Sequence, residues 1–360
     1  MKFGVKTLLK VFIGIVLFVV ALVICYLIYF FITYYRIEDN QVITIHNPVT
    51  KVAQANTKYT IITYNIGFGA YSSDYGFFMD GGTESRAFSK EAVLMNTNGS
   101  IGLVLEQNPD FAFLQEVDMN STRSYHVNQY EMVQDAFSDM TSAIAVNFDS
   151  PYLFYPILEP HGKSYSGIVT LSNFKMNQVI RRSLPIDSGL SKFVDLDRCY
   201  SVSEIEVENG KKLFLYNVHL SAYSNEPTTV ERQVALLVAD MKEKYKAGNY
   251  IIVGGDFNQD VLGNSSEIYH TEAFDYSWAK KFDTSVLPEY FNFAKPEITE
   301  QLVPTCRLAD GEYVKGESFV IAIDGFIISD NITVEEVNHV DSGFLYSDHN
   351  PVTMRFILND

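Results

Sequence analysis

The 360-residue chain has few cysteines. Three are present, too few for the disulfide framework of a small secreted domain. Cys199 and Cys306 lie outside the apolar N-terminus; they either pair or stay as buried free thiols, and their spacing does not decide between these states. No HExxH or CxxC spacing occurs, so the sequence does not indicate a zinc site.

Basic residues are also scarce beyond the N-terminus. From residue 37 onward, 23 Lys and Arg stand against 44 Asp and Glu, a net charge of −21. Such a surface repels polyanions at long range and offers no general footprint for nucleic acid, although it leaves room for a local basic groove. No Pro-, Gly- or Ser-rich linker divides residues 58–360, so we expect one globular domain there.

The N-terminus carries a long apolar run. Residues 11–32 contain no charge, and about 20 such residues span a bilayer as a helix. Three lysines precede the run and one arginine closes it, which favours a cytoplasmic N-terminus and an extracytoplasmic remainder. A cleaved signal peptide is the alternative, but its apolar region would be shorter and would end in small residues. We predict a single-pass membrane protein with a cytoplasmic tip and transmembrane anchor at 1–36, a stalk or linker at 37–57 and the globular domain at 58–360.

Short runs of β-branched and aromatic residues predict many strands, with few helices between them. This pattern favours a mixed α/β or α+β domain. The predicted helices cover 85–106 and 229–246. The predicted strands cover 59–64, 111–115, 142–148, 167–171, 200–207, 213–218, 250–253, 322–328 and 352–356.

Polar residues stand at the ends of several of these strands. They are Asn65, Glu116, His219, Asp256 with Asn258, Asp324, and Asp348 with His349. A single such residue is usually a turn former or a satisfied core residue. Together, at the ends of rigid strands, they would present their side chains to a shared cleft. Carboxylate and amide oxygens suit Mg²⁺, Mn²⁺ or Ca²⁺, so the set favours a hard divalent cation.

These residues, in this order, resemble the endonuclease/exonuclease/phosphatase superfamily, which includes DNase I-like nucleases and bacterial sphingomyelinases. The resemblance covers about residues 58–358 and implies a four-layer sandwich of two mixed β-sheets flanked by helices. Its motifs are specific to the superfamily and do not identify a substrate. They are Asn65, Gln115-Glu116, Ser166-Gly167, His219, Gly255-Asp256-Phe257-Asn258, Ile323-Asp324 and Ser347-Asp348-His349.

The resemblance also implies a metal site. Glu116 would bind the essential divalent cation, with help from Asn65, and Asp348 would support the site or help to bind the metal. Mg²⁺ is the expected ion, with Mn²⁺ or Ca²⁺ as alternatives. The globular domain would therefore be a catalytic domain.

Catalytic roles follow from the same resemblance. Asp324 would orient His349, which would then activate water or contact the phosphate. Asp256 is the rival general base, and the resemblance leaves that choice open. Asn258 and His219 would donate hydrogen bonds to non-bridging phosphate oxygens as charge builds in the transition state.

Two further features bear on substrate. The aromatic loop at 67–82 departs from the common family pattern and would border the site; it would form a substrate wall, touch a membrane, or simply cover the core with its rings. Arg123, Arg182 and Arg198 are candidate phosphate contacts.

We therefore expect a metal-dependent phosphoesterase acting outside the cytoplasm at the membrane surface, on phospholipid head groups or small phosphodiesters. The alternatives are an extracellular DNase I-like endonuclease and a non-catalytic anchored binding protein; the second is disfavoured because every core motif is present. Charge favours the first function, because the expected rim segments 68–84, 118–130, 220–230 and 260–300 contain only Arg123, Lys280, Lys281 and Lys295. The sequence indicates a membrane partner and no protein partner.

Overall fold

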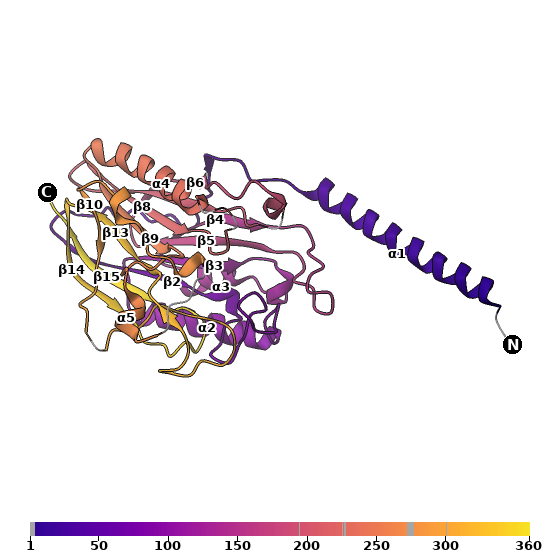
Figure 1. Cartoon of the computed structure of the whole chain (residues 1–360). Coiled ribbons are helices and arrows are strands. Elements are labelled where there is room, and N and C mark those ends of the chain that lie inside the picture. The colour runs from indigo at the N-terminus through magenta and orange to yellow at the C-terminus, as the bar shows by residue number, and fades with distance from the viewer. Residues whose placement is uncertain (1–3, 194, 225, 227, 272–276, 300) are drawn as a thin grey trace.

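The computed structural model describes residues 4–193, 195–224, 226, 228–271, 277–299 and 301–360. Two β-sheets stack face to face with helices outside them, and the N-terminal helix α1 (Val5–Thr33) projects away from this body (Figure 1). The predicted four-layer α+β sandwich is therefore confirmed.

One sheet has six strands in the order β14-β15-β2-β3-β5-β4. Strands β2 and β3 are parallel, and the other neighbours are antiparallel. Helices α2 (Lys90–Glu106) and α3 (Gln129–Ala136) pack on its outer face, where Val104 and Val133 meet Leu114 in one apolar cluster. The strands are β14 Ile332–His339, β15 Val352–Leu358, β2 Lys58–Asn65, β3 Phe111–Asp118, β5 Tyr165–Ser172 and β4 Thr141–Asp149.

The other sheet has seven strands in the order β1-β6-β7-β8-β9-β13-β10. Only β8 and β9 are parallel to each other. Helix α4 (Thr229–Lys246) covers the outer face through Leu237 and Met241, which pack with Val253. The strands are β1 Gln41–Val42, β6 Met176–Ser183, β7 Cys199–Glu206, β8 Lys212–His219, β9 Tyr250–Asp256, β13 Asp324–Ser329 and β10 Phe291–Ala294.

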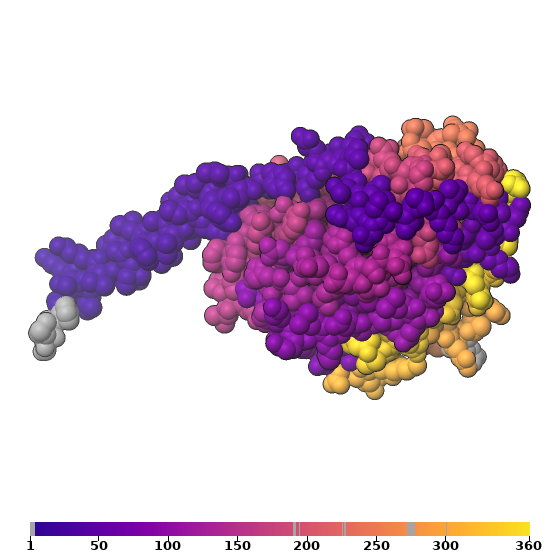
Figure 2. Space-filling model, turned by 180° about the vertical axis from the view of Figure 1, so that it is seen from behind, coloured from indigo at the N-terminus to yellow at the C-terminus, as the bar shows by residue number. Residues whose placement is uncertain are grey.

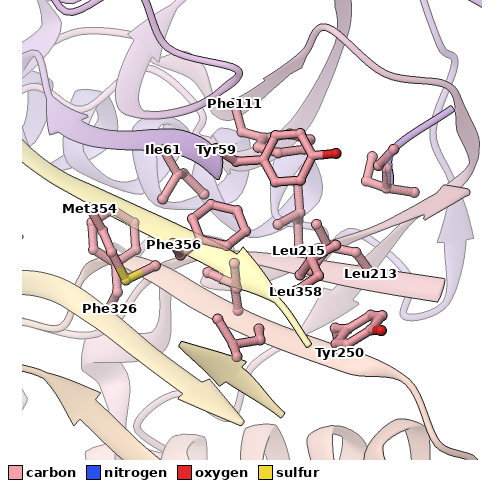
Figure 3. Close-up of a cluster of buried hydrophobic side chains, with 14 of the residues drawn as sticks. Tyr59, Ile61, Phe111, Leu213, Leu215, Tyr250, Phe326, Met354, Phe356 and Leu358 are labelled. Carbon is pink, nitrogen blue, oxygen red and sulfur yellow. The ribbon is translucent and has the colours of Figure 1, made fainter. Parts of the chain in front are cut away.

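The core lies between the two sheets. Ile61 and Phe356 from the first sheet pack with Leu215 and Phe326 from the second, all fully buried (Figure 3). Each such side chain contributes about 1.5–3 kcal/mol on burial, so this layer fixes how the sheets are placed against each other.

Small elements complete the chain. Helix α5 (Ser265–Tyr269) and the two-stranded sheet of β11 (Cys306–Arg307) and β12 (Val320–Ile321) lie in the connections near the site. Short 3-10 helices cover Gly67–Gly69, Thr122–Ser124, Leu190–Phe193, Ser277–Ala279 and Thr284–Val286.

The local predictions differ from the structure in places. The helix expected from residue 85 begins at Lys90, because the Ser89 side chain caps it by accepting a hydrogen bond from the Ala92 N–H at 3.1 Å. Helix α3 and strands β6 and β14 were not predicted from the sequence. β14 alternates buried and exposed residues on either side of a register shift between Val334 and Glu336, and this interruption weakens the period-2 signal of a half-buried strand.

The segment predicted as a stalk does not stand apart from the domain. β1 pairs with β6, and further bridges join His46 to Ser142 and Ala53 to Val207. The chain between α1 and β2 therefore runs along the domain surface. The boundary at residue 57 itself stays a prediction.

Helix α1 is long and apolar enough to cross a membrane. It has 29 residues, a mean hydropathy of 3.3 over its most apolar window, and none of that window is buried (Figure 2). Only the length and composition of α1 indicate a membrane span.

The two cysteines outside α1 are not paired. Cys199 and Cys306 are buried free thiols, so of the two expected states the unpaired one is found.

Candidate active site

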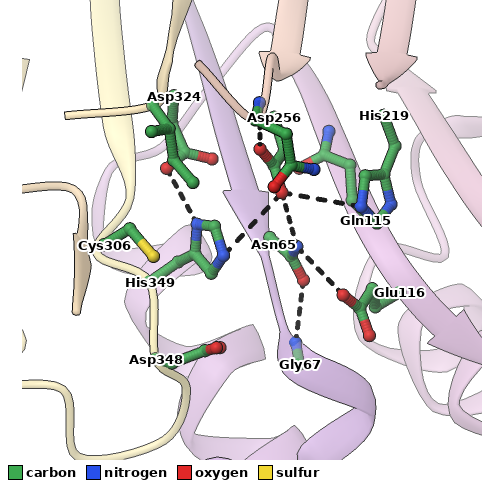
Figure 4. Close-up of polar contacts among 12 residues, drawn as sticks. Asn65, Gly67, Gln115, Glu116, His219, Asp256, Cys306, Asp324, Asp348 and His349 are labelled. Carbon is green, nitrogen blue, oxygen red and sulfur yellow. Dashed lines mark hydrogen bonds and ion pairs between the residues drawn. The ribbon is translucent and has the colours of Figure 1, made fainter. Parts of the chain in front are cut away.

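The predicted site residues meet at one edge of both sheets. Because neighbouring parallel strands end at the same edge, the pairs β2–β3 and β8–β9 bring Asn65, Glu116, His219 and Asp256 together. Asp324 begins the antiparallel strand β13 at this edge, directly opposite Asp256. Figure 4 shows these side chains pointing toward one another.

Glu116 occupies a β-bulge. Leu114 of β3 pairs with Val169 and Val117 with Gly167, so β3 carries one extra residue across this step. Glu116 itself has φ of 55°, a left-handed conformation that costs a non-glycine residue energy and is found most often at functional sites. The bulge turns its side chain, 23% exposed, out of the sheet and into the cleft.

Asn65 links the two sheets at the floor of the site. Its Nδ2 group donates to Glu116 Oε1 at 3.3 Å and to Asp256 Oδ2 at 3.1 Å, and its Oδ1 accepts from the Gly67 N–H at 3.0 Å. One amide therefore sets the separation between the carboxylates of Glu116 and Asp256.

Gly255 allows β9 to lie close to β8 at the site. It has φ of 142°, and a Cβ added there would lie 2.0 Å from the Val218 carbonyl oxygen. Any side chain would push β9 away from β8 and displace Asp256. The glycine of the Gly255-Asp256-Phe257-Asn258 motif is thus required by packing.

Asp324 and His349 form a hydrogen-bonded pair. His349 Nδ1 donates to Asp324 Oδ2 at 2.8 Å, which leaves Nε2 directed toward Asp256 Oδ2, 3.8 Å away. Burial lowers the pKa of His349, but the charge and hydrogen bond of Asp324, together with Cys306 and Asp348, outweigh it and raise that pKa well above the usual value. The structure thus places the two predicted residues in contact, and their catalytic roles stay predictions.

Asp256 lies at the centre of the set. Its Oδ1 accepts from the Asn258 N–H at 2.8 Å, and its Oδ2 is 3.6 Å from His219 Nε2. Burial, with a smaller contribution from Asp324, raises its pKa to about 7. A carboxyl group with this pKa can exchange a proton near neutral pH.

His219 and Asn258 line the same cleft. Burial, with the charge of Arg198 next in importance, keeps the pKa of His219 well below its usual value, so the ring is neutral. Its Nδ1 is buried and has no hydrogen-bond partner among the described residues. Asn258 uses one amide N–H to donate to the Leu220 carbonyl at 2.9 Å, which fixes the side chain and leaves its second N–H available.

Asp348 sits on the connection that enters β15. Ser347 holds this connection against β2 by donating to the Asn65 carbonyl at 2.7 Å, and Arg307 N–H donates to the Asp348 carbonyl at 2.9 Å. Burial raises the pKa of the Asp348 carboxyl to about 6, and Glu116 acts in the same direction. Asp348 therefore faces the same cleft as Glu116.

The donor set suits a hard cation. Glu116 and Asp348 are carboxylates on one side of the cleft, with the Asn65 amide between Glu116 and Asp256. Asp256, Asp324 and His349 are a second group, whose ligand atoms lie within 4.8 Å of one another, and Asp324 Oδ1 is buried with no hydrogen-bond partner in the part of the chain that the structure describes. The residues present therefore fit a divalent metal, and they offer two overlapping ways to hold it.

The structure also identifies a supporting residue that the sequence analysis missed. Gln115 Nε2 donates to Asn217 Oδ1 at 2.8 Å, and Asn217 Nδ2 donates to the Val169 carbonyl at 2.8 Å. Asn217 is a buried amide inside the apolar strand β8, and that interruption was its only signal in the sequence. The bridge joins the two sheets directly below Glu116 and His219.

The aromatic loop at 67–82 packs inward. Phe68, Tyr71 and Tyr75 are buried in one cluster, so the reading in which these rings cover the core is correct. Arg307, which is fully buried and was not predicted, holds this loop by donating to the carbonyls of Ser72 and Tyr75 at 2.9 and 3.1 Å. The loop is therefore a fixed wall of the site.

The three candidate arginines differ. Arg123 is buried and bidentate to Asp118, and Arg182 pairs with Asp39 and Asp240 away from the cleft. Arg198 is buried near His219, just before the start of β7, and its Nε and Nη1 have no partner among the described residues. Arg198 is thus the candidate with free donors at the site.

Comparisons with known proteins agree with this geometry. The profile of the endonuclease/exonuclease/phosphatase family matches residues 62–285, and no curated protein matches the chain. An endonuclease/exonuclease/phosphatase from Beutenbergia cavernae superposes with a TM-score of 0.54 at 13% identity, covering 84% of this chain and 72% of that one.

Two further solved structures are similar. D. rerio TDP2, complexed with single strand DNA product, has a TM-score of 0.52 at 14% identity and covers 84% of this chain and 99% of its own. The human Nocturnin catalytic domain with bound sulfate has a TM-score of 0.52 at 16% identity, covering 87% of this chain and 97% of its own. At such low sequence identity, the structural similarity shows a shared fold and no more. The family profile, which matches more than half of the sequence, shows that the chain belongs to the endonuclease/exonuclease/phosphatase family of phosphoester hydrolases.

Proposed function

We propose that the chain is a divalent-metal-dependent phosphodiesterase, anchored by α1, that acts outside the cytoplasm on phospholipid head groups or other small phosphodiesters. The observation that carries the catalytic part is the arrangement at the sheet edge. The His349–Asp324 pair faces Asp256, and Asn65 connects Asp256 to Glu116.

Glu116 and Asn65 would hold Mg²⁺, or Mn²⁺ or Ca²⁺ in its place, with Asp348 in support. A cation at this position offsets charge on the phosphate and on the leaving oxygen. The protein's part is to fix Glu116 through the β-bulge and to hold the Glu116 and Asp256 carboxylates apart through Asn65. A charge-reducing change at Glu116 would therefore weaken metal binding directly.

Proton transfer is assigned to the cluster around Asp256. Asp324 holds His349 with Nδ1 protonated, so Nε2 is the nitrogen that faces the reacting groups. With its pKa raised, His349 contacts the phosphate as a hydrogen-bond donor, or takes the water proton once Nε2 has lost its hydrogen; Asp256, with its pKa of about 7, is the rival base. His219, Asn258 and Arg198 donate to phosphate oxygens as their negative charge grows.

The substrate assignment is argued from charge. A duplex nuclease needs several Lys or Arg contacts to the phosphate backbone. Of the four basic residues in the predicted rim segments, Arg123 is buried and already forms an ion pair with Asp118. Few donors remain for a long polyanion, whereas Arg198 alone suffices for a single phosphodiester group. An anchor also confines the site to the membrane, which raises the effective concentration of lipid head groups.

A nuclease is the second candidate, because D. rerio TDP2, which shares this fold, was captured with single strand DNA product. The two functions separate in one experiment. The purified full chain is incubated with sphingomyelin or phosphatidylcholine vesicles, bis-p-nitrophenyl phosphate and plasmid DNA at physiological salt, with and without Mg²⁺. Lipid or small-ester turnover with little plasmid nicking supports the proposal; efficient nicking without turnover of any lipid or small ester makes it a nuclease.

A further inference from the structure

A second apolar surface lies beside the outer end of α1. Residues 152–158, here called the apolar loop, form the middle of the connection from β4 to β5 and carry no charged residue. Phe154 and Tyr155 are exposed, Ile157 is 83% exposed and Leu158 is 100% exposed. Soluble surfaces rarely present so many large apolar side chains in one short segment, and such a patch marks an interaction site.

The apolar loop touches α1 at a defined height. The Tyr26 hydroxyl donates to the Tyr152 carbonyl at 3.3 Å, the Tyr152 N–H donates to the Tyr29 hydroxyl at 3.2 Å, and the Tyr26 and Phe154 rings meet edge to face at 5.1 Å. A helix rises 1.5 Å per residue, so Tyr26 lies about 9 Å below Ile32, the last residue of the apolar run. If α1 spans the bilayer, the loop must enter the same leaflet.

A second contact fixes this arrangement. Phe193 packs against Phe31 at 5.1 Å and against Tyr34 at 4.6 Å, and Arg36 donates to the carbonyls of Asp195 and Leu196. The outer end of α1 is thus held between two loops of the domain. Its orientation relative to the domain is set by these contacts, and Figure 1 shows α1 leaving from that side of the sheets.

The apolar loop is also connected to the wall of the active site. Tyr155 contacts Phe78 of the aromatic loop at 5.8 Å, and Ser85 donates to the Glu159 carbonyl at the end of the same connection. At the base of the connection, Phe148 lies against the Arg123 guanidinium, which is 3.8 Å from Glu116. Insertion of the loop would therefore bring the mouth of the site close to the lipid head groups.

We infer that the apolar loop inserts into the outer leaflet beside α1 and docks the active site on the bilayer. This depth, about 5–10 Å, is where apolar and aromatic side chains bind at the head-group boundary. The occupant is the lipid bilayer, because the loop is uncharged and is continuous with the surface of α1. The inference rests on the proposed membrane anchoring and predicts a phosphoester held in the membrane as substrate.

The test uses the full chain reconstituted in phosphatidylcholine vesicles. Leu158→Trp places a reporter on the loop. Ile298→Trp places one on an exposed site whose neighbours Glu297 and Thr299 line a cavity with β14, and β14 lies at the end of the domain away from α1 (Figure 1). The wild type, whose single tryptophan is buried Trp278, gives the background. Lipids brominated in the acyl chain should quench the emission that Leu158→Trp adds over the wild type and leave the emission that Ile298→Trp adds unquenched, as expected for insertion to this depth.

If the emission of Leu158→Trp were the same in brominated and unbrominated vesicles, as expected for Ile298→Trp, the inference would be overturned. A blue shift that grows with protein density without quenching would assign the loop to a second copy of the chain and also overturn it. Because quenching needs no turnover, it decides the matter even in an inactive protein. In an active one, Ile157→Asp with Leu158→Asp should lower the ratio of lipid to bis-p-nitrophenyl phosphate turnover at least tenfold, and an unchanged ratio would contradict docking.

Discussion

Replacement of Asp324 by Asn tests whether His349 depends on its partner. The carboxylate accepts a 2.8 Å hydrogen bond from His349 Nδ1 and is the leading reason that the pKa of this histidine is high despite burial. Asn keeps the shape but removes the charge, and its amide N–H can turn toward Nδ1 and favour the other tautomer. We expect the pKa of His349 to fall, so that the ring loses its positive charge and keeps a single hydrogen, on Nε2.

The size of the effect follows from the bond that is lost. A hydrogen bond to a charged group contributes about 1.5–3 kcal/mol. At 1.36 kcal/mol for each tenfold change, kcat/KM on bis-p-nitrophenyl phosphate should fall roughly 10- to 150-fold. His349→Ala should cost at least ~10², the lower range for lost general acid–base catalysis. The assay is steady-state hydrolysis at saturating Mg²⁺, with thermal unfolding as a control for the fold.

The double variant decides whether the two residues act as a unit. Asp324→Asn added to His349→Ala should cost little more than His349→Ala alone, because Asp324 has no histidine left to orient. Losses that multiply would refute the partnership. Near-wild-type activity in His349→Ala would assign the base role to Asp256.

Three further predictions concern the arginine, the pH and the anchor. Arg198→Met should lower kcat/KM roughly 10- to 100-fold through the lost charged donor, while Arg182→Met, a matched change away from the cleft, should not; equal losses would remove Arg198 from the site. Burial raises the pKa of Asp256 to about 7 and of Asp348 to about 6, and a cation binds only the deprotonated carboxylates. The increase in melting temperature caused by Mg²⁺ should therefore be larger at pH 8 than at pH 5.5. An increase that stays constant or shrinks over this range would contradict the raised pKa values. Protease added to intact cells should remove the globular domain and leave a short N-terminal fragment, whereas a soluble form that begins near residue 37 would indicate a cleaved signal peptide.

The sequence predicts the site better than the surface around it. Asn65 and Glu116 stand at the ends of the parallel strands β2 and β3, and His219 and Asp256 at the ends of the parallel strands β8 and β9, so each pair was predictable once the strands were placed. That the two pairs face each other depends on how the two sheets stack. The resemblance supplied the partner of His349, since Asp324 is 25 residues away and no local pattern joins them.

The supporting residues could not be predicted in the same way. Arg307 anchors the aromatic loop through carbonyls more than 200 residues away, and Asn217 bridges the two sheets, so both depend on tertiary packing. The apolar loop was missed for a related reason. No prediction from the sequence covers residues 152–158, and only the structure shows that Ile157 and Leu158 are exposed on the loop that touches α1.

The central claim is that Glu116 carries metal-dependent phosphoester hydrolysis. The most direct measurement is Mg²⁺-dependent turnover of bis-p-nitrophenyl phosphate by the full chain and by Glu116→Gln, which keeps the size of the side chain and removes its charge. The wild type should be active with Mg²⁺, inactive after EDTA and active again when metal is restored, while Glu116→Gln should be folded and inactive. Turnover that survives EDTA, or that is unchanged in Glu116→Gln, would contradict the assignment.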